Sequence, residues 1–380
     1  MTNRNVLILK FPYSSLFGGG EQHTLNLVEG LRKRGFSFFL ISSCSVLLRE
    51  FQNRNWPCKK IWAPKEPVAK GSVILFPFLA PYFLVRLFLL LIIYIANYRI
   101  KILYCFSLTE KILITLPARI LGIKVVWIEH VTVERWLTLN PFKIFYRFYS
   151  HFAKIVAISE AIRKQLIEEI KINPKRILVI YNGVNLPPAN FHDFKSRVNK
   201  KGFIVGVIAR LEREKGIEYL LRAIEIVKEI IPQIKLIVVG EGSQKKNLQW
   251  LARSININNL VQFVGFQENI KGWIRNFDAL VLPSAKRESF GIVLIETMAN
   301  LRPVIASRIG GITEIIEDKK TGLLVEPANS EELAQAIIYL YNHPQEVLQI
   351  IKQARVKVES SFTKEQMINA FEKLFITLLR

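Results

Sequence analysis

Short apolar runs alternate with helical segments along most of the chain. Residues 6–11 form an apolar run, a glycine-containing loop follows, and residues 21–34 place Leu25, Val28 and Leu31 on one helical face. A strand, a glycine-rich turn and a helix in this order open a doubly wound α/β domain. Further apolar runs predict strands at 36–42, 100–106, 124–128, 155–159 and 177–181.

The same alternation of apolar runs and helical segments recurs in the second half of the chain. Residues 187–202 are proline-containing, polar and aperiodic, which is typical of a linker between domains. Strands are then predicted at 203–208, 235–239, 261–264, 279–283, 303–306 and 322–325. We therefore predict an α/β protein with two Rossmann-like doubly wound domains, at 1–186 and 203–362, facing each other across a cleft. A last helix, 365–379, is apolar on all sides and must dock on another part of the chain.

Residues 71–98 are the most apolar part of the chain, interrupted by Pro77, Pro81 and Arg86. The unbroken stretch 87–96 is shorter than the roughly 20 residues that span a bilayer. A buried crossover helix is the favoured interpretation. An interfacial helix in contact with a membrane, helped by Arg86, Arg99 and Lys101, is the second, and a transmembrane span is the least favoured.

The net charge of +22 is concentrated in the first half. Residues 1–185 carry 26 basic and 10 acidic residues, whereas the remainder carries 27 and 21. A basic surface attracts nucleic acid, anionic lipid or phosphorylated substrates. No helix-turn-helix, zinc-finger or RNA-recognition signature accompanies the charge, so we expect no nucleic acid partner. Three widely spaced cysteines and the lack of a signal peptide indicate a cytoplasmic protein.

The stretch 284–300, SAKRESFGIVLIETMAN, contains the most informative polar residues. Glu288 lies just before a predicted helix, where a carboxylate accepts hydrogen bonds. Glu296 lies within an apolar run and needs a cation or the hydroxyls of a ligand as its partner. Gly291 permits close backbone approach, and free amides at a helix start suit an oxygen-rich ligand. A surface loop with a capping and an ion-paired glutamate fits this stretch equally well.

The first domain offers two weaker candidates for a ligand site. The amides of Gly19 and Gly20, within the turn 18–20, are positioned to approach a phosphate, although a flexible turn gives the same pattern. His130 follows a predicted strand at the edge where α/β proteins bind ligands, although a structural histidine is the commoner case. His23 is interpreted as structural or solvent-facing.

Several ordered motifs together resemble a known family. They are the R-L-x-x-x-K-G segment at 210–216, the E-x7-E segment from Glu288 to Glu296, and the run from Arg302 to Gly311. Glu21 beside the glycine-rich turn, His130, residues 158–159 and the Asn-Gly-Val turn at 182–184 belong to the same set. The chain resembles the GT4-type retaining glycosyltransferases (glycosyl transferases group 1), whose fold is GT-B.

The resemblance implies a role for each site residue. Arg210 and Lys215 would balance the charge that develops on the diphosphate of a nucleotide-sugar donor. Glu296 would bind the ribose, Glu288 the transferred sugar, and His130 would sit by the sugar and the acceptor. The remaining donor-binding residues would be Gly19 and Gly20 at the diphosphate, Phe266 at the base, and Phe290, Gly291 and Ile292 at the sugar and phosphate. The last helix, 363–380, would pack back onto the first domain.

We therefore expect a hexosyltransferase that uses a UDP- or GDP-sugar and retains the anomeric configuration. The expected acceptor is a hydroxyl of a cell-envelope glycan or of a lipid-linked, lipopolysaccharide-type molecule, met at the inner face of the cytoplasmic membrane through the basic first domain. No Asp-x-Asp occurs in the sequence, so no metal cofactor is expected. A sugar-nucleotide epimerase, a soluble disaccharide synthase and a non-enzymatic membrane-binding protein are the alternatives.

Overall fold

The computed structural model describes residues 4–13, 18–189 and 202–380, and divides the chain into two compact units. Unit 1 comprises Met1–Asn182 together with Lys364–Arg380, and unit 2 comprises Gly183–Thr363. The boundary thus falls four residues before the predicted one at 186. Most of the predicted linker 187–202 lies outside the described residues. Its first residue, Pro187, belongs to unit 2, where its carbonyl accepts a hydrogen bond from Arg355 Nη2 at 2.9 Å.

Unit 1 is built on a seven-stranded parallel sheet, as the alternation of apolar runs and helices predicts. In their order across the sheet, the strands are β3 (Cys58–Lys60), β2 (Ser37–Ser42), β1 (Asn5–Lys10), β4 (Ile102–Cys105), β5 (Lys124–Glu129), β6 (Lys154–Ala157) and β7 (Ile177–Val179). The central strands are buried along their length, which explains their continuous apolar sequence.

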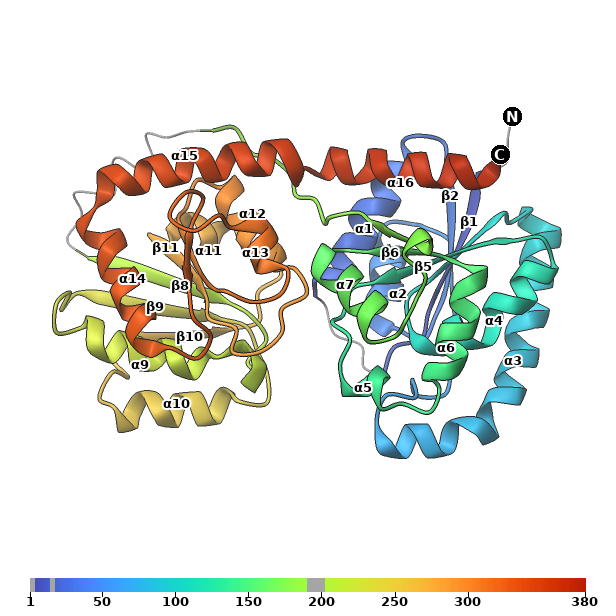
Figure 1. Ribbon diagram of the computed structural model, residues 1–380, viewed down its shortest axis with the longest axis horizontal. Coiled ribbons are helices and arrows are strands. Elements are labelled where there is room, and N and C mark those ends of the chain that lie inside the picture. Colours follow the sequence, from blue (N-terminus) through green and yellow to red (C-terminus); the bar gives the residue numbers. More distant parts are fainter. Residues whose placement is uncertain (1–3, 14–17, 190–201) are drawn as a thin grey trace. The chain divides into compact units, whose positions relative to one another are not determined.

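The helices of unit 1 lie around this sheet (Figure 1). They are α1 (Gly19–Arg32), α2 (Ser45–Asn53), α3 (Lys70–Tyr98), α4 (Leu108–Ile120), α5 (Arg135–Thr138), α6 (Lys143–Tyr149), α7 (Glu160–Glu168) and α16 (Lys364–Leu379), with 3₁₀ turns η1 (Ser150–Phe152) and η2 (Pro174–Arg176). Gly19 and Gly20, predicted in a turn, form the first turn of α1 instead.

The last helix, α16, packs on α1. Phe371 and Phe375 are buried, and a side chain at Gly30 would overlap Ile368, so the two helices approach closely. Arg34 pairs with both Glu365 and Glu372 at the end of this contact. The first and the last described helices of the chain therefore share one unit.

Helix α3 is the predicted crossover helix between β3 and β4, but it is buried on one side only. It runs unbroken for 29 residues, and only 17% of its most apolar window is buried. It is long and apolar enough to cross a membrane by length and composition. Pro77 and Pro81 lie inside it, and its ribbon bends (Figure 1), because each proline removes a helical hydrogen bond.

Unit 2 contains a six-stranded parallel sheet. Its strands, in order, are β10 (Val261–Gly265), β9 (Ile234–Val239), β8 (Phe203–Ile208), β11 (Ala279–Leu282), β12 (Val304–Ser307) and β13 (Leu323–Val325). Its helices are α9 (Ile217–Val227), α10 (Lys245–Ser254), α11 (Lys271–Asn276), α12 (Ile292–Ala299), α13 (Ile312–Ile315), α14 (Ser330–Asn342) and α15 (Pro344–Ser361), with the 3₁₀ turn η3 (Arg213–Lys215). Residues from β8, β9, α9 and α14 form one continuous apolar core.

Candidate functional site

Lys215 and Glu288 form an ion pair at the carboxyl edge of the unit 2 sheet. Lys215 Nζ lies 2.7 Å from Glu288 Oε2, and Ser284 Oγ donates to the same oxygen at 2.9 Å. Lys215 stands in the loop after β8, and Glu288 in the loop after β11, which is the neighbouring strand. Both side chains are largely buried, at 16% and 11% exposed. The sheet therefore brings together two of the residues that the sequence singled out.

The backbones of the two loops also contact each other. Gly216 has φ +63°, and a Cβ there would fall 2.1 Å from the carbonyl oxygen of Pro283. The amide of Ala285 donates to the carbonyl of Glu214 at 2.9 Å. The glycine after Lys215 is thus required by the left-handed φ and by the close approach of the next loop. These contacts fix the backbone position of Lys215.

Gly310 and Gly311 hold the Glu288 loop from the other side. A Cβ on Gly310 would lie 2.1 Å from the carbonyl oxygen of Glu288, and one on Gly311 would lie 2.3 Å from that of Ser289. The amide of Gly311 donates to the Glu288 carbonyl at 3.0 Å. The two glycines of the motif therefore position the Glu288 backbone.

Helix α12 starts directly after this loop. Its N-cap, Gly291, has φ +89°, and Ile292 is the first helical residue. Phe290 is buried and packs edge-on against Phe362, with ring centroids 5.6 Å apart, so it anchors the turn. The first-turn amides of a helix have no acceptor within it and suit an anionic or hydroxyl-rich ligand. The geometry of Gly291 and Ile292 thus fits their predicted role.

The partner of Glu296 was left open between a cation and the hydroxyls of a ligand. The two cations of the motif have other partners, because Lys215 pairs with Glu288 and Arg210 lies 3.5 Å from Glu214. Glu296 is half-buried on α12, and burial raises the pKa of its carboxyl to about 7, partly opposed by the charge of Lys271. The carboxyl is therefore poised between its two protonation states at neutral pH.

Arg210 and Phe266 lie at the same edge of the sheet but point outward. Arg210 is 59% exposed in the loop after β8, and Phe266 is 50% exposed directly after β10. The loops between them are joined by backbone hydrogen bonds, since Gly240 donates to Gly265 at 2.8 Å and Leu211 donates to Glu241 at 2.9 Å. Both side chains are exposed at this edge, with Arg210 held 3.5 Å from Glu214.

In unit 1, His130 lies against the start of α1. A Cβ on Gly20 would be 3.7 Å from His130 Cδ2, and the rings of His23 and His130 meet edge-on at 4.7 Å. Phe106 stacks on the other face of His130 at 5.8 Å. Gly20 and His130, two separate candidates of the first domain, are therefore brought together. His23 is buried, which agrees with its interpretation as a structural residue.

Both histidines are held neutral. Burial lowers the pKa of His23 to about 4, an effect that the amide of Asn182 partly opposes. Burial also lowers the pKa of His130 well below its usual value, and the charges of Lys10 and Lys111 add to the effect. His130 Nε2 is buried and has no hydrogen-bond partner within the part of the chain that the structure describes. A neutral imidazole with an unused nitrogen is suited to a hydroxyl or carbonyl group.

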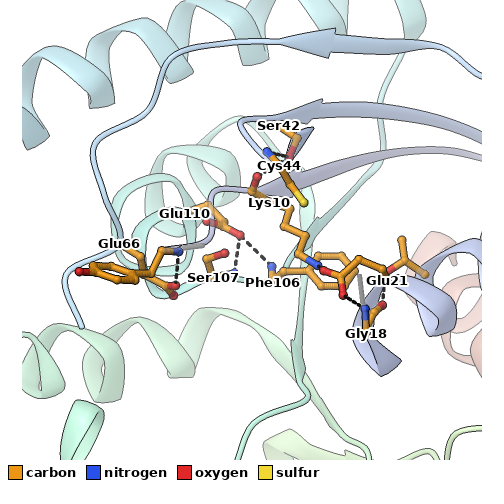
Figure 2. Close-up of polar contacts among 12 residues, drawn as sticks. Lys10, Gly18, Glu21, Ser42, Cys44, Glu66, Phe106, Ser107 and Glu110 are labelled. Atoms are coloured by element: carbon orange, nitrogen blue, oxygen red, sulfur yellow. Dashed lines mark hydrogen bonds and ion pairs between the residues drawn. The ribbon is translucent and has the colours of Figure 1, made fainter. Parts of the chain in front are cut away.

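Lys10 and Glu21 form a buried ion pair that the sequence did not predict, although Glu21 was noted beside the glycine turn (Figure 2). Glu21 also accepts from the Gly18 amide at 3.1 Å, which fixes the start of α1. Lys10 lies over the Phe106 ring, 5.3 Å from its centroid. Lys10 is the last residue of β1. A lysine at the end of an apolar strand is the sequence feature that could have indicated this buried pair.

A second group of charged residues surrounds the start of α4 (Figure 2). Glu110 accepts from the amides of Phe106 and Ser107, and Glu66 accepts from the amides of Leu108 and Tyr13. Burial raises the pKa of both carboxyls, that of Glu110 to about 8. The sequence S-x-x-E at 107–110 is a capping-box pattern and marked this helix start, although the sequence predictions omit α4.

Lys111, Glu129 and Tyr146 form a buried cluster nearby. Lys111 Nζ lies 2.6 Å from Glu129 Oε1, and Tyr146 donates to the same oxygen at 2.6 Å. Glu129 precedes His130 at the end of β5, so the cluster fixes the strand end that carries the histidine. The sequence pattern did not mark these residues. Each lies in a different segment, where a single polar residue only interrupts an apolar pattern.

Each half of the chain matches the model of a known protein family. The model for glycosyl transferases group 1 matches residues 189–357, and the model for Glycosyltransferase Family 4 matches residues 17–187. An uncharacterized glycosyltransferase of Methanocaldococcus jannaschii is 31% identical over 48% of this chain and 50% of its own. The N-acetyl-alpha-D-glucosaminyl L-malate synthase of Bacillus anthracis is 28% identical over 60% of each chain. The matched stretch thus spans 50 to 60% of the length of these relatives.

The fold matches a solved structure over nearly its full length. Anabaena HepE, crystallised in complex with UDP, aligns with a TM-score of 0.80 and 21% identity, over 98% of this chain and 100% of that one. The two Rossmann-like units therefore adopt the GT-B fold that the sequence predicted. Two family models, one on each unit, and the ordered motifs on both sheets agree, and the chain belongs to the GT4-type glycosyltransferases, the glycosyl transferases group 1.

Proposed function

We propose that this protein transfers a hexose from a nucleotide sugar to a hydroxyl of a cell-envelope glycan or lipid-linked acceptor. The observation that carries the proposal is the Lys215–Glu288 pair, held by Gly216 on one side and by Gly310 on the other. Transfer breaks the bond between the sugar and the diphosphate of the donor. A cation beside a carboxylate suits the two groups that this bond joins. Lys215 would meet the diphosphate, and Glu288 the hydroxyls of the sugar.

The chemistry follows from the charge that moves during transfer. As the bond between the sugar and the phosphate lengthens, negative charge grows on the leaving diphosphate. Lys215 and Arg210, fixed at a strand end, would stabilise that charge, and the first-turn amides of α12 would add to the effect. Glu288, freed from part of its contact with Lys215, would hold the sugar hydroxyls. Glu296 would accept from the ribose hydroxyls.

The donor proposed is a UDP- or GDP-sugar. HepE, which shares the fold, was crystallised with UDP, and this supports a nucleotide-sugar donor. Phe266, exposed after β10, would flank the base. His130 would act as a neutral hydrogen-bonding group beside the sugar and the acceptor, with Gly20 beside it. Transfer would retain the anomeric configuration, with the leaving phosphate accepting the proton of the acceptor hydroxyl.

The acceptor class rests on the charge and surface of unit 1. Its basic balance and its exposed apolar helix suit a substrate anchored in an anionic membrane, so we place the enzyme at the inner face of the cytoplasmic membrane. A soluble acceptor is the alternative, and the name of the malate synthase from Bacillus anthracis provides one example. An epimerase would need no acceptor.

Thermal unfolding of the full chain against a panel of UDP-, GDP- and ADP-sugars tests the donor. A nucleotide that binds only the folded state raises the melting temperature according to its affinity. The selected donor is then incubated with a membrane extract, and the products are analysed. A new glycolipid supports the proposal. An altered sugar nucleotide without an acceptor product would indicate an epimerase, and the absence of any nucleotide-induced shift would contradict the transferase.

A further inference from the structure

Helix α3 leaves an apolar surface uncovered. It is apolar on all sides, yet only one side packs on unit 1, through Phe76, Phe83 and Leu87 among others. On the other side Phe78 is 78% exposed and Tyr82 63%. A helix that is apolar all round is normally enclosed by protein or by lipid, because exposed apolar patches of this size are unfavourable in water.

Helix α6 extends this surface. Phe76 of α3 meets Phe142, at the start of α6, with ring centroids 5.1 Å apart. Beyond that contact Ile144 is 76% exposed, Phe145 50% and Phe148 52%. Helices α3 and α6 both pack on α4. The apolar side chains that these two helices leave exposed are here called the α3–α6 face: Phe78, Tyr82, Leu89, Ile144, Phe145 and Phe148.

The charges around the α3–α6 face have one sign. The sequence contains no Asp or Glu from 67 to 109 or from 135 to 159. The same stretches contribute Lys70 and Arg99 at the two ends of α3, Arg86 within it, and Lys143 and Arg147 on α6. Tyrosine and tryptophan also gather at this side, since Trp62 is half exposed and contacts Tyr82. Basic residues around an apolar surface with amphipathic aromatics are complementary to an anionic lipid headgroup layer.

A transmembrane arrangement of α3 conflicts with the sheet. The strand before the helix, β3, pairs with β2, and the strand after it, β4, pairs with β1. The two ends of α3 are therefore tied to one sheet on one side of any membrane. Spanning about 30 Å of hydrocarbon would pull β4 away, because only Arg99–Lys101 connect it to the helix.

A second copy of the chain fits the face less well than lipid does. A two-fold contact brings the same surface of both copies together. The α3–α6 face would then place Arg86, Lys143 and Arg147 against a surface with the same positive charges, and these stretches of sequence offer no carboxylate to balance them. Anionic headgroups would balance every one of these charges.

We infer that the α3–α6 face docks on an anionic bilayer, with α3 lying in the plane of the interface and its outer side chains among the acyl chains. The inference deepens the proposed function, since it names the surface by which unit 1 would reach a membrane-held acceptor. Its own evidence is the exposed surface and its charge, and neither depends on the transfer reaction.

The test is flotation of the full chain with vesicles, without any sugar nucleotide. Vesicles of phosphatidylcholine with one third phosphatidylglycerol are compared with pure phosphatidylcholine, at low and at high salt. We expect binding to the anionic vesicles that weakens with salt. The variant Phe78→Ser/Ile144→Ser/Phe148→Ser should bind at least about tenfold more weakly, because three apolar side chains no longer enter the bilayer. Lys143→Glu/Arg147→Glu should bind about tenfold more weakly and lose most of the salt dependence.

A matched variant on unit 2 provides the control. Trp250 is 67% exposed on α10, and Lys246 is exposed on the same helix. Trp250→Ser/Lys246→Glu should float like the unchanged protein. Circular dichroism and thermal unfolding verify that every variant is folded, which the exposed positions favour.

Three outcomes would overturn the inference. The first is that the unchanged protein does not bind anionic vesicles. The second is that the α3–α6 variants bind as well as the control does. The third is that light scattering shows a dimer that the apolar variant converts to a monomer, which would assign the face to a second copy. None of these outcomes bears on donor binding, so a failure here is distinct from a failure of the proposed transferase.

Discussion

Lys215 Nζ contacts Glu288 Oε2 at 2.7 Å, although the two residues are 73 positions apart in the sequence. The contact exists because β8 and β11 are neighbours in the sheet and each ends in a loop at the same edge. In this state the cation and the carboxylate satisfy each other. A bound sugar diphosphate would offer phosphate oxygens to Lys215 and hydroxyls to Glu288. Without a ligand, the ion pair keeps both side chains in position.

Glu288→Gln should lower kcat/KM by about 100-fold or more, because a neutral amide neither orients the sugar hydroxyls as strongly nor supports the adjacent cation. Lys215→Gln should have a comparable effect. Steady-state kinetics with the identified donor measures both. The control is Glu317→Gln, which breaks the exposed Lys320–Glu317 pair in the loop before β13 and should leave the rate unchanged. Full activity of Glu288→Gln would remove this residue from the site.

Gly310→Ala should weaken donor binding about tenfold and lower stability by about 1 to 3 kcal/mol. The new Cβ would lie 2.1 Å from the Glu288 carbonyl, and alanine is strained at φ +50°. Calorimetric titration of the nucleotide and urea unfolding give the two values. Gly272→Ala is the matched control, since a Cβ there meets nothing within 4 Å, and it should be neutral or stabilising by up to about 1 kcal/mol. Equal behaviour of the two variants would contradict the positioning role of Gly310.

Donor affinity should rise about tenfold between pH 6 and pH 8. With a pKa of about 7, Glu296 is mostly protonated at the lower pH and mostly ionised at the upper, and the ionised form accepts hydrogen bonds better from ribose hydroxyls. Titration calorimetry with the intact sugar nucleotide measures the effect. In Glu296→Gln the dependence on pH should flatten. A steep dependence that survives in this variant would have to arise from another group.

Folding stability should fall as pH rises from about 5 to above 8, in part because of Glu110. Its folded-state pKa of about 8 lies above the usual value of 4.5, so the folded chain holds a proton that the unfolded chain releases. The stabilisation is complete below the unfolded pKa and disappears as pH passes the folded one. Glu110→Gln keeps the oxygen that accepts from Phe106 and Ser107, and should make the pH dependence shallower. Urea unfolding at pH 5 and at pH 8.5 compares the two proteins.

Removal of divalent metals should leave the transfer rate unchanged. The proposed cations at the diphosphate are Arg210 and Lys215, and the sequence contains no Asp-x-Asp pair to bind a metal–diphosphate complex. The measurement is the initial rate in excess chelator and after addition of magnesium or manganese. A rate that falls with chelator and returns with metal would overturn this expectation.

The parallel sheets and the arrangement of unit 2 were largely predictable from sequence. Strand 203–208 has the predicted bounds, and the loop carrying Lys215 and the stretch 284–300 lie at one edge because parallel strands end together. The partner of Glu296 stayed open between a cation and the hydroxyls of a ligand, since spacing along the chain cannot say which of several groups a carboxylate meets. Packing decides that.

Unit 1 was harder to predict for a different physical reason. Helix α3 has the composition of a buried helix, and sequence alone does not reveal that only one of its sides is covered. The buried group of Lys10, Glu66, Glu110, Lys111 and Glu129 is assembled from four separate segments, and each residue alone looks like a surface charge. Within this group of charged residues, the sequence motifs had marked only the neighbours Glu21, the glycine turn and His130.

The return of α16 to α1 has a consequence for how the chain is made. Unit 2 is one contiguous segment, whereas unit 1 lacks the helix that covers His23 and Tyr104 until residues 364–379 have also been synthesised. Residues 1–182 therefore complete their unit only after the whole of unit 2 has been made. A released chain that stops at residue 363 should contain a protease-resistant unit 2 and a unit 1 that remains open to cleavage.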